Sequence, residues 1–285
     1  MVTVEDIRSA TRDLALSGRP LCVHSSLSSF GRVEGGAPTV IEALLAEGCT
    51  VMVPTFSWGF AVPPPPGIRP ERNGWDYDAW PGPTDGIGRI YRPDTNEVDT
   101  ETMGAVPAAV VGMPGRVRGN NPLSSFTAIG PLAGGLMSGQ APLDLYAPFR
   151  ALTEAHGSVV LMGVALVRMT LLHLAEKMAG RNQFRRWANG PDGQPMVVEA
   201  GGCSGGFGKF ETILSPLMTQ RTVGKSVWRV FPAREALQAA ADAIRRDPHL
   251  THCGDLECDR CEDSVRGGPI LSGETALTRG DKPGA

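Results

Sequence analysis

Short apolar runs alternate with amphipathic stretches along the first half of the chain. Residues 21–24, 50–54 and 158–164 are apolar runs with the length and composition of buried strands. Helical periodicity lies between the early runs, over residues 4–16 and again over 39–45. This alternation predicts an α/β fold in which helices cover a mixed or parallel central sheet.

A small polar loop joins the first predicted strand to the helix that follows it. The loop holds serines at 25, 26, 28 and 29 and then Gly35-Gly36, before Thr39 as the expected helix cap. Free backbone N–H groups and hydroxyls in such a loop can bind phosphate oxygens. A solvated surface loop has the same composition, so this segment alone leaves both interpretations open.

The second strand also ends in polar residues, over the segment 55–58. Ligands of open α/β sheets bind in crevices beyond the carboxyl ends of the strands. We therefore expect the segment 55–58 and the serine loop to border one binding crevice.

A histidine and a glutamate stand three residues apart on an apolar helical pattern over residues 169–176. Residues three apart share one helix face, so His173 and Glu176 can touch. A carboxylate would hold the imidazole in one tautomer and stabilise its protonated form, which suits a general base. A purely structural contact between the two side chains has the same spacing.

Five motifs follow one another in a fixed order between about residue 20 and about residue 235. They are His24-Ser25-Ser26-Leu27-Ser28 before Gly35-Gly36, Pro54-Thr55-Phe56-Ser57, Thr102-Met103-Gly104, Arg118 with Pro122, Ser125 and Gly130, and Thr170 to Glu176 after an apolar strand. Together they resemble the aminoglycoside 3-N-acetyltransferases, also called the antibiotic N-acetyltransferase family. The resemblance implies acetyl transfer from acetyl-CoA to an amino group of an aminoglycoside, which gives resistance to the drug.

The resemblance also implies direct transfer, with His173 as general base, Glu176 orienting it and Thr102 near the thioester. A first group of residues would bind the coenzyme: Ser25, Ser26, Leu27, Ser28, Gly31, Arg118 and Ser125. A second group would contact the acceptor: Trp58, Asp76, Asp78, Arg168 and Glu199. No catalytic metal is predicted.

Departures from the family pattern bear on the acceptor. Many members carry an aspartate six residues before the histidine, where this chain has Val167 followed by Arg168. An arginine repels a polyamine and can pair with a carboxylate through two parallel hydrogen bonds. The default acceptor is a deoxystreptamine drug acetylated at its 3-amine, and the alternative is kasugamycin, which carries a carboxylate and is acetylated at its 2′-amine.

A long insertion over residues 59–101 lacks clear periodicity and holds Pro63 to Pro66, the aromatic residues Trp75, Tyr77 and Trp80, and scattered aspartates. Long ordered loops in compact domains are usually functional. We expect the insertion to cover the active site, where carboxylates and aromatic faces suit a sugar that bears an ammonium group. An extended surface loop is the alternative.

Composition narrows the class of protein. The chain has 285 residues, of which 20% are charged, and its net charge is −3. This charge does not indicate a nucleic-acid-binding protein. It contains no run of about eighteen apolar residues that would predict a membrane span, and its first residues lack the pattern of a secretory signal. We expect a cytoplasmic enzyme with reduced cysteines and a small-molecule acceptor. The sequence does not indicate an oligomeric state.

Three cysteines gather near the C-terminus as Cys253-x4-Cys258-x2-Cys261, with His249 and His252 close by. They can bind structural zinc, but one compact cluster lacks the second ligand pair of most zinc folds, so zinc is not favoured. The cluster is far along the chain from the matched motifs, and we expect it to be dispensable for chemistry. The acetyltransferase domain is expected over residues 1–265, with a disordered tail over 266–285.

Other mechanisms and classes stay open at this point. A covalent acetyl-enzyme on Cys203 is disfavoured, because no histidine is placed beside it and an unactivated thiol is little ionised near neutral pH. A serine hydrolase would pair a serine of the 24–29 loop with His173, yet the chain lacks Gly-x-Ser-x-Gly. A non-catalytic drug-binding protein would have no use for an intact His173 and Glu176.

Overall fold

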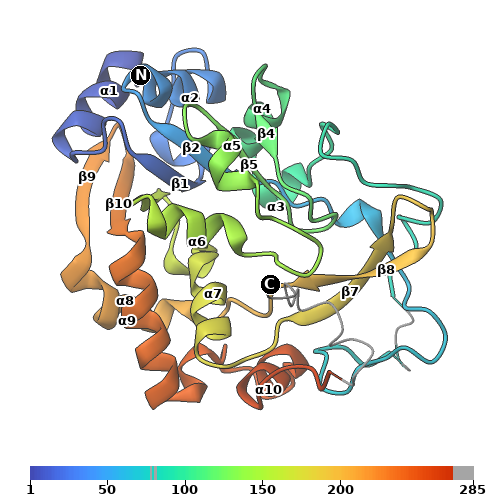
Figure 1. Ribbon diagram of the computed structural model, residues 1–285. Helices are drawn as coiled ribbons and strands as arrows, with labels where there is room; N and C mark the ends of the chain where they lie inside the picture. The colour runs from blue at the N-terminus through green and yellow to red at the C-terminus, as the bar shows by residue number, and fades with distance from the viewer. Residues whose placement is uncertain (78, 80–81, 272–285) are drawn as a thin grey trace, which may run out of the picture.

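A seven-stranded mixed sheet forms the centre of the protein, in the computed structural model that describes residues 1–77, 79 and 82–271 (Figure 1). The strand order is β4-β5-β2-β1-β6-β10-β9, with β1 parallel to β2 and β6 and the outer strands antiparallel. The strands are β1 (Pro20–Ser25), β2 (Thr50–Pro54), β4 (Val117–Arg118), β5 (Phe126–Ile129), β6 (Ser158–Met162), β9 (Thr219–Val223) and β10 (Ser226–Pro232). The predicted α/β fold with a mixed sheet is confirmed.

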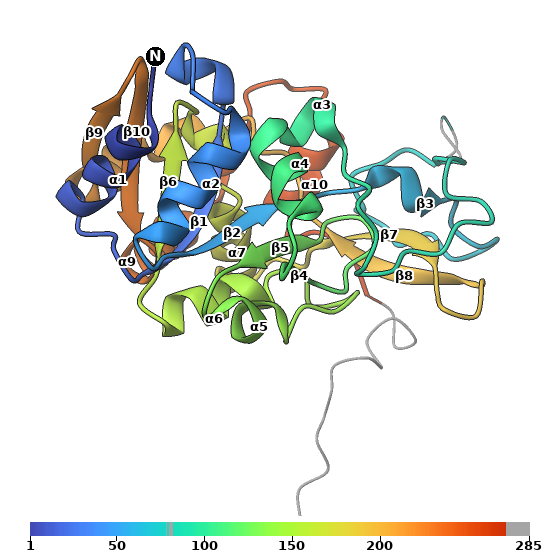
Figure 2. The ribbon, with the colours of Figure 1, turned by 90° about the horizontal axis from the view of Figure 1, so that it is seen from above.

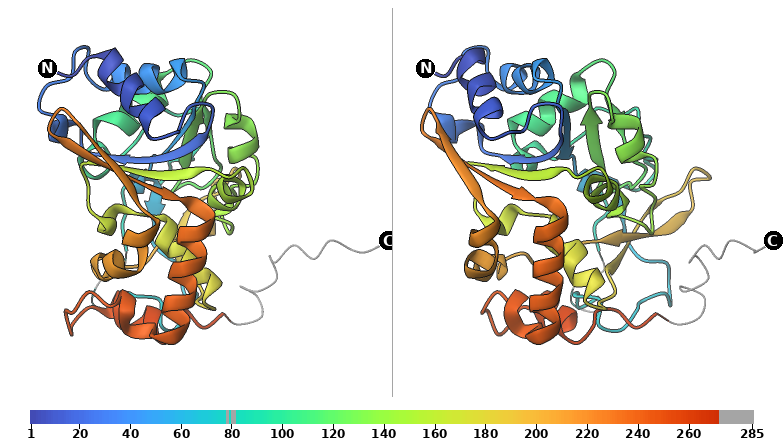
Figure 3. Two further views of the ribbon diagram at one scale, coloured as in Figure 1. Left: turned by 90° about the vertical axis from the view of Figure 1, so that its left-hand side faces the viewer. Right: turned by 60° about the vertical axis from the view of Figure 1, so that its left-hand side comes forward.

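Helices cover both faces of this sheet, as Figure 3 shows. One layer is α1 (Val4–Asp13), α2 (Ala37–Ala46) and α4 (Ala105–Gly112); the other is α5 (Ala133–Met137), α6 (Ala147–Glu154), α7 (Leu171–Met178), α8 (Glu211–Leu214) and α9 (Ala233–Arg246). Successive side chains of a strand point to opposite faces, so Leu21 and Val23 enter the core under the first layer and Cys22 enters the other. The parallel strands are therefore apolar throughout, which made them recognisable in the sequence.

Glycines with positive φ set several boundaries that the hydrophobic pattern misplaced. The helix expected at 39–45 begins at Ala37, and its N-cap is Gly36 with φ of 72°, so the expectation that Thr39 caps it is wrong. The strand expected over 158–164 ends at Met162, because Gly163 has φ of 67° and leaves the extended conformation.

A second, three-stranded sheet lies beside the main one (Figure 2). It consists of β3 (Ala61–Val62), β7 (Phe184–Asn189) and β8 (Pro195–Ala200), with β7 in the middle and all pairs antiparallel. The insertion over 59–101 contributes β3 to this sheet, packs on it through Trp75 and Tyr77, and leads into the short helix α3 (Thr100–Met103). Asn73 fixes its path, since its side chain donates to the carbonyl of Arg185 at 2.8 Å and accepts from the amide of Arg185 at 2.7 Å.

After α9 the C-terminal segment forms the short helix α10 (Asp259–Val265) and packs back on the domain (Figure 1). Beyond α10 the amide of Asn182 donates to the carbonyl of Gly267 at 2.9 Å, and the amide of Ile270 donates to Glu71 at 3.0 Å. Part of the segment expected as a tail thus packs on the domain, and residues 272–285 lie outside the described residues. No helix in the described part of the chain has the length and apolar character needed to cross a membrane.

Candidate functional site

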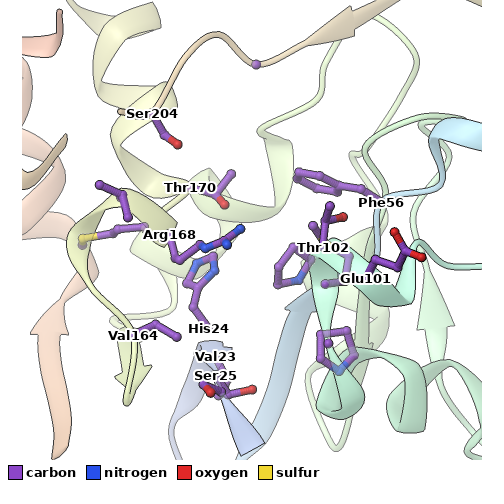
Figure 4. A pocket seen from close by; sticks show the side chains of 18 of the residues that line it. Val23, His24, Ser25, Phe56, Glu101, Thr102, Val164, Arg168, Thr170 and Ser204 are labelled. Atoms are coloured by element: carbon purple, nitrogen blue, oxygen red, sulfur yellow. The ribbon is translucent and has the colours of Figure 1, made fainter. Parts of the chain in front are cut away.

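A cavity of about 950 Å³ opens at the carboxyl ends of the three parallel strands. Its walls come from the loop after β1, the segment after β2, the α3–α4 corner, the turn before α7 and the segment 201–207 (Figure 4). Trp75 and Glu101 of the insertion also line it, so the insertion borders the cavity as predicted. The two loops expected at one crevice do meet there.

The serine loop forms one wall. Ser25, Ser26, Leu27, Ser28 and Gly31, the predicted coenzyme residues of this loop, all line the cavity. The hydroxyls of Ser26 and Ser28 lie 3.0 Å apart, and the buried hydroxyl of Ser25 has no hydrogen-bond partner within the described residues. A buried hydroxyl without a partner is a group that a ligand can satisfy.

Gly104 shapes another part of the cavity wall, where it ends α3 and begins α4. Its φ of 84° turns the chain sharply between the two helices. Thr102 lies on the preceding turn, is exposed and lines the cavity. Figure 4 shows Thr102 and Phe56 across the cavity from Arg168 and Thr170. The structure thus places Thr102 in the cavity wall, and its position near the thioester stays a prediction.

His173 and Glu176 meet on α7 as the spacing predicted. Nδ1 of His173 lies 2.7 Å from Oε2 of Glu176, and both side chains are buried. Because a carboxylate only accepts, Nδ1 carries the donated proton and Nε2 keeps its lone pair. His173 lines the cavity, and no other described side chain hydrogen-bonds its Nε2.

Two aromatic rings hold the imidazole in place. The ring of Phe207 lies 4.7 Å from it, and the ring of Tyr146 stacks on it at 6.3 Å with an interplanar angle of 15°. Burial, together with the charges of Glu176 and Glu199, raises the pKa of Tyr146 well above its usual range, so this hydroxyl stays neutral. A Cβ at Gly201 would stand 2.8 Å from the Tyr146 hydroxyl, so the close approach of that backbone requires glycine.

Arg118 and Ser125, the other two predicted coenzyme ligands, do not line the cavity. Arg118 is 5% exposed and donates to the carbonyls of Thr55 at 2.6 Å and Thr95 at 2.9 Å, and to the hydroxyl of Ser125 at 2.9 Å. The structure therefore places the pair behind the segment after β2, where it supports the cavity wall.

The predicted acceptor residues divide into two groups. Trp58 and Arg168 line the cavity, whereas Asp76 and Glu199 do not, and Asp78 lies outside the described residues. Glu199 is buried in ion pairs, 2.9 Å from Lys177 and 3.2 Å from Arg185. The side chain of Asp76 accepts a hydrogen bond from the amide of Ala79 at 3.1 Å.

Arg168 points into the cavity beside His24 (Figure 4). Burial of His24 and the nearby charge of Arg168 lower the pKa of that histidine to about 3, so its ring is neutral. The side chain of Arg168 forms no hydrogen bond or ion pair with the residues that the structure describes, and it is exposed. It is a cation available to a ligand.

Several residues of the site carried no usable sequence signal. Tyr146 is a single aromatic outside the matched motifs, and it reaches His173 through tertiary packing. Arg186 and Arg260 line the cavity from elements far apart in sequence. Four arginines and one glutamate are the charged side chains of the described lining: Arg32, Arg168, Arg186, Arg260 and Glu101. The cavity is thus rich in positive charge.

Comparison with known proteins agrees with the motifs. Residues 22–245 match the family model described as aminoglycoside 3-N-acetyltransferase. Aminoglycoside N(3)-acetyltransferase IX of Micromonospora chalcea is 35% identical over 86% of this chain and 78% of its own length, and the type VIII enzyme of Streptomyces fradiae is 34% identical over 57% and 56%. The crystal structure of aminoglycoside acetyltransferase AAC(3)-IVa superposes with a TM-score of 0.72 at 25% identity, over 93% of this chain and 97% of the other. The predicted enzyme class is confirmed, and the chain belongs to the aminoglycoside 3-N-acetyltransferase family.

Proposed function

We propose that this protein transfers the acetyl group of acetyl-CoA directly to an amino group of an aminoglycoside, with His173 as the general base. The observation that carries the proposal is the buried pair of His173 and Glu176, joined over 2.7 Å, in the cavity that the serine loop also lines. Relatives support the ligands: a histidine-to-alanine mutant of AAC(3)-IVa is known in complex with a gentamicin, and AAC-IIIb, at 21% identity, as a binary complex with CoASH.

A base is needed because the amino group of the substrate is protonated. An ammonium group has no lone pair, so it must lose a proton before its nitrogen can attack the thioester carbonyl. Nε2 of His173 accepts that proton, directly or through a water molecule, and Glu176 stabilises the resulting imidazolium through Nδ1. The new C–N bond forms, the C–S bond breaks, and the coenzyme leaves as a thiol after taking up a proton.

The serine loop would hold the coenzyme. The unpartnered hydroxyl of Ser25 and the neighbouring hydroxyls of Ser26 and Ser28 offer hydrogen bonds to phosphate or pantetheine oxygens. Arg32 lines the same end of the cavity and can neutralise phosphate charge. By the family resemblance, Thr102 lies near the thioester. Since acetyl-CoA is a metabolite of the cytoplasm, the proposal places the reaction there.

The charge of the cavity bears on which aminoglycoside binds. Arg168 carries a free positive charge close to the reacting centre, and Glu101 is the one carboxylate of the described lining. A drug with many ammonium groups would meet repulsion there, whereas an acceptor with few amines and a carboxylate could pair with Arg168. This observation favours kasugamycin, acetylated at its 2′-amine, as the second candidate beside 3-N-acetylation of a deoxystreptamine drug.

Two other mechanisms lack support in the geometry. A serine hydrolase needs a serine hydroxyl hydrogen-bonded to its base, and no described hydroxyl bonds to His173. An acetyl-enzyme on Cys203 needs an activated thiol, yet burial raises the pKa of Cys203 and no histidine contacts its sulfur in the described chain.

The test is thiol release from acetyl-CoA, measured with and without amines from a panel that includes gentamicin and kasugamycin. The proposal expects release that depends on an amine, and mass spectrometry should find one acetyl group on that amine. Hydrolysis of simple esters would favour the hydrolase, and binding of a drug without either activity would favour a binding protein. The position of the acetyl group decides between 3-N and 2′-N transfer.

A further inference from the structure

The structure brings Cys203 to the three cysteines near the C-terminus. The Sγ atoms of Cys203, Cys253, Cys258 and Cys261 all lie within 4.8 Å of one another. Cys203 follows β8, about fifty residues before the others, so spacing along the chain offers no reason to group the four. We propose that these four cysteines bind one structural zinc ion, and that this ion fixes the segment 201–207 of the active-site wall.

The spacing of the sulfurs suits zinc. Zinc bound by four thiolates is tetrahedral with Zn–S distances of about 2.3 Å, which sets the sulfurs about 3.8 Å apart. Sulfurs within 4.8 Å of one another reach that arrangement by small rotations of their side chains. All four cysteines are free thiols in the structure, so no disulfide competes for them there.

The backbone around the cluster is shaped to approach sulfur closely. Cys258 is the N-cap of α10 and Cys261 lies in its first turn, a Cys-x2-Cys pair that presents two ligands from one helix end. The amide of Gly205 donates to the sulfur of Cys203 at 3.4 Å, and the amide of Cys253 donates to the sulfur of Cys261 at 3.3 Å. Such hydrogen bonds orient metal ligands.

Gly205 supports the same assignment. A Cβ at this position would stand 2.7 Å from the Cβ of Cys253 and 3.4 Å from the sulfur of Cys203. The segment 201–207 can therefore come close enough to share an ion with the C-terminal segment only because this residue lacks a side chain.

The group of potential metal ligands among the described residues consists of the four cysteines alone, and the nearby His252 is engaged elsewhere. Nε2 of His252 lies 3.1 Å from Oε1 of Glu262, and its Nδ1 accepts a hydrogen bond from the amide of Gly254 at 3.0 Å. Four sulfurs in a tetrahedron suit zinc or iron among the common metals. Simple iron–sulfur sites have two chelating cysteine pairs, whereas this site has one Cys-x2-Cys pair and two ligands from separate loops. We therefore assign zinc.

The ion would link a segment that contacts His173 to a segment that contacts the partners of His173, Glu176 and Arg181. Phe207, in the segment that begins with Gly201, packs on the ring of His173. From the C-terminal segment, Ser264 and Thr251 hydrogen-bond the guanidinium of Arg181, which in turn binds Glu176. The cluster is far along the chain from the matched motifs, yet in the fold its two segments lie beside His173 and Glu176. That it is dispensable for the chemistry stays a prediction.

Two measurements on the whole, reduced protein, purified without chelator, test the assignment. Elemental analysis should find one zinc per chain, and X-ray absorption at the zinc edge should find four sulfurs at about 2.3 Å. A shell of three sulfurs and one nitrogen or oxygen would overturn the role of Cys203. Stoichiometric iron would overturn the choice of zinc, and a metal-free protein with four reactive thiols or two disulfides would overturn the site.

A pair of variants in the same segment isolates the fourth ligand. Cys203→Ser should lose zinc to a competing chelator at a concentration at least about tenfold lower than wild type requires, because one thiolate is replaced by a poor ligand. Ser204→Ala, next to it and with no sulfur, should hold zinc as wild type does. Equal retention by both variants would contradict the proposal, and if Cys203→Ser fails to fold, the absorption spectrum of the wild-type protein still decides.

Discussion

Arg181 donates a hydrogen bond of 2.7 Å to Oε1 of Glu176, the carboxylate oxygen that His173 leaves free. Both partners are buried, and Arg181 is itself held by Thr251 at 2.7 Å. The carboxylate is thus fixed from one side by a cation and presents its other oxygen to the imidazole. In the mechanism that we propose, Glu176 is therefore a positioning residue, and we expect both its charge and its geometry to matter.

Glu176→Gln should lower kcat on the order of a hundredfold or more, with little change in the KM for acetyl-CoA. With Arg181 holding the amide oxygen, the NH2 group would face Nδ1 of His173, which would then have to accept, and the proton would move to Nε2. Steady-state kinetics measure this, with Glu154→Gln on the exposed surface of α6 as the matched control. A kcat near that of the control would mean that Glu176 does not set the tautomer.

Arg181→Met should destabilise the fold by roughly 3–5 kcal/mol, because it leaves the buried carboxylate of Glu176 without its cation. Denaturant unfolding measures this against Arg245→Met, which removes an exposed pair with Asp242 and should cost less than about 1 kcal/mol. Equal losses in the free energy of unfolding would show that the buried ion pair stabilises the fold no more than the exposed pair does.

His24 should make the fold less stable in acid. Its pKa is about 3 in the folded state and about 6.5 in the unfolded chain, so between these values only the unfolded chain carries the proton. Stability is therefore full above about pH 6.5 and falls as the pH falls toward 3, by up to about 1.4 kcal/mol per pH unit from this residue. His24→Asn should flatten the dependence between pH 6 and pH 4, and His156→Asn, at an exposed position, should not. Parallel curves for His24→Asn and wild type would contradict the prediction.

Arg168→Ala should shift the ratio of kcat/KM for kasugamycin over gentamicin toward gentamicin by about tenfold or more. The reason is the free guanidinium in the cavity, which repels extra ammonium groups and can pair with a carboxylate. Arg92→Ala changes an exposed arginine outside the described lining and should leave the ratio unchanged. If both substrates respond equally to Arg168→Ala, the charge of Arg168 does not select the acceptor.

Sequence patterns located the parts of the site that depend on local structure. The apolar run over 50–54 matches β2 at both ends, because a strand buried on both faces reads as a continuous apolar stretch. The i, i+3 spacing of His173 and Glu176 fixed their contact, since helix geometry is local.

Sequence patterns did not reveal the side-chain contacts that depend on tertiary packing. Arg118 belongs to a recognised motif, yet its guanidinium turns to the carbonyl of Thr55 behind the cavity, a contact across two strands that no spacing reveals. Glu199 was expected to contact the acceptor, but Lys177 and Arg185 pair with it in the interior. The meeting of Cys203 with the C-terminal cysteines likewise depends on how the chain returns after α9.

The most direct test of the account is amine-dependent thiol release by His173→Ala, compared with wild type and with His156→Asn. We predict a fall in kcat on the order of a hundredfold or more for His173→Ala, because the attacking ammonium has lost its base, with coenzyme affinity unchanged. His156→Asn, whose side chain is exposed outside the described cavity lining, should keep its activity. Turnover by folded His173→Ala close to that of wild type would remove His173 from the mechanism and contradict the account.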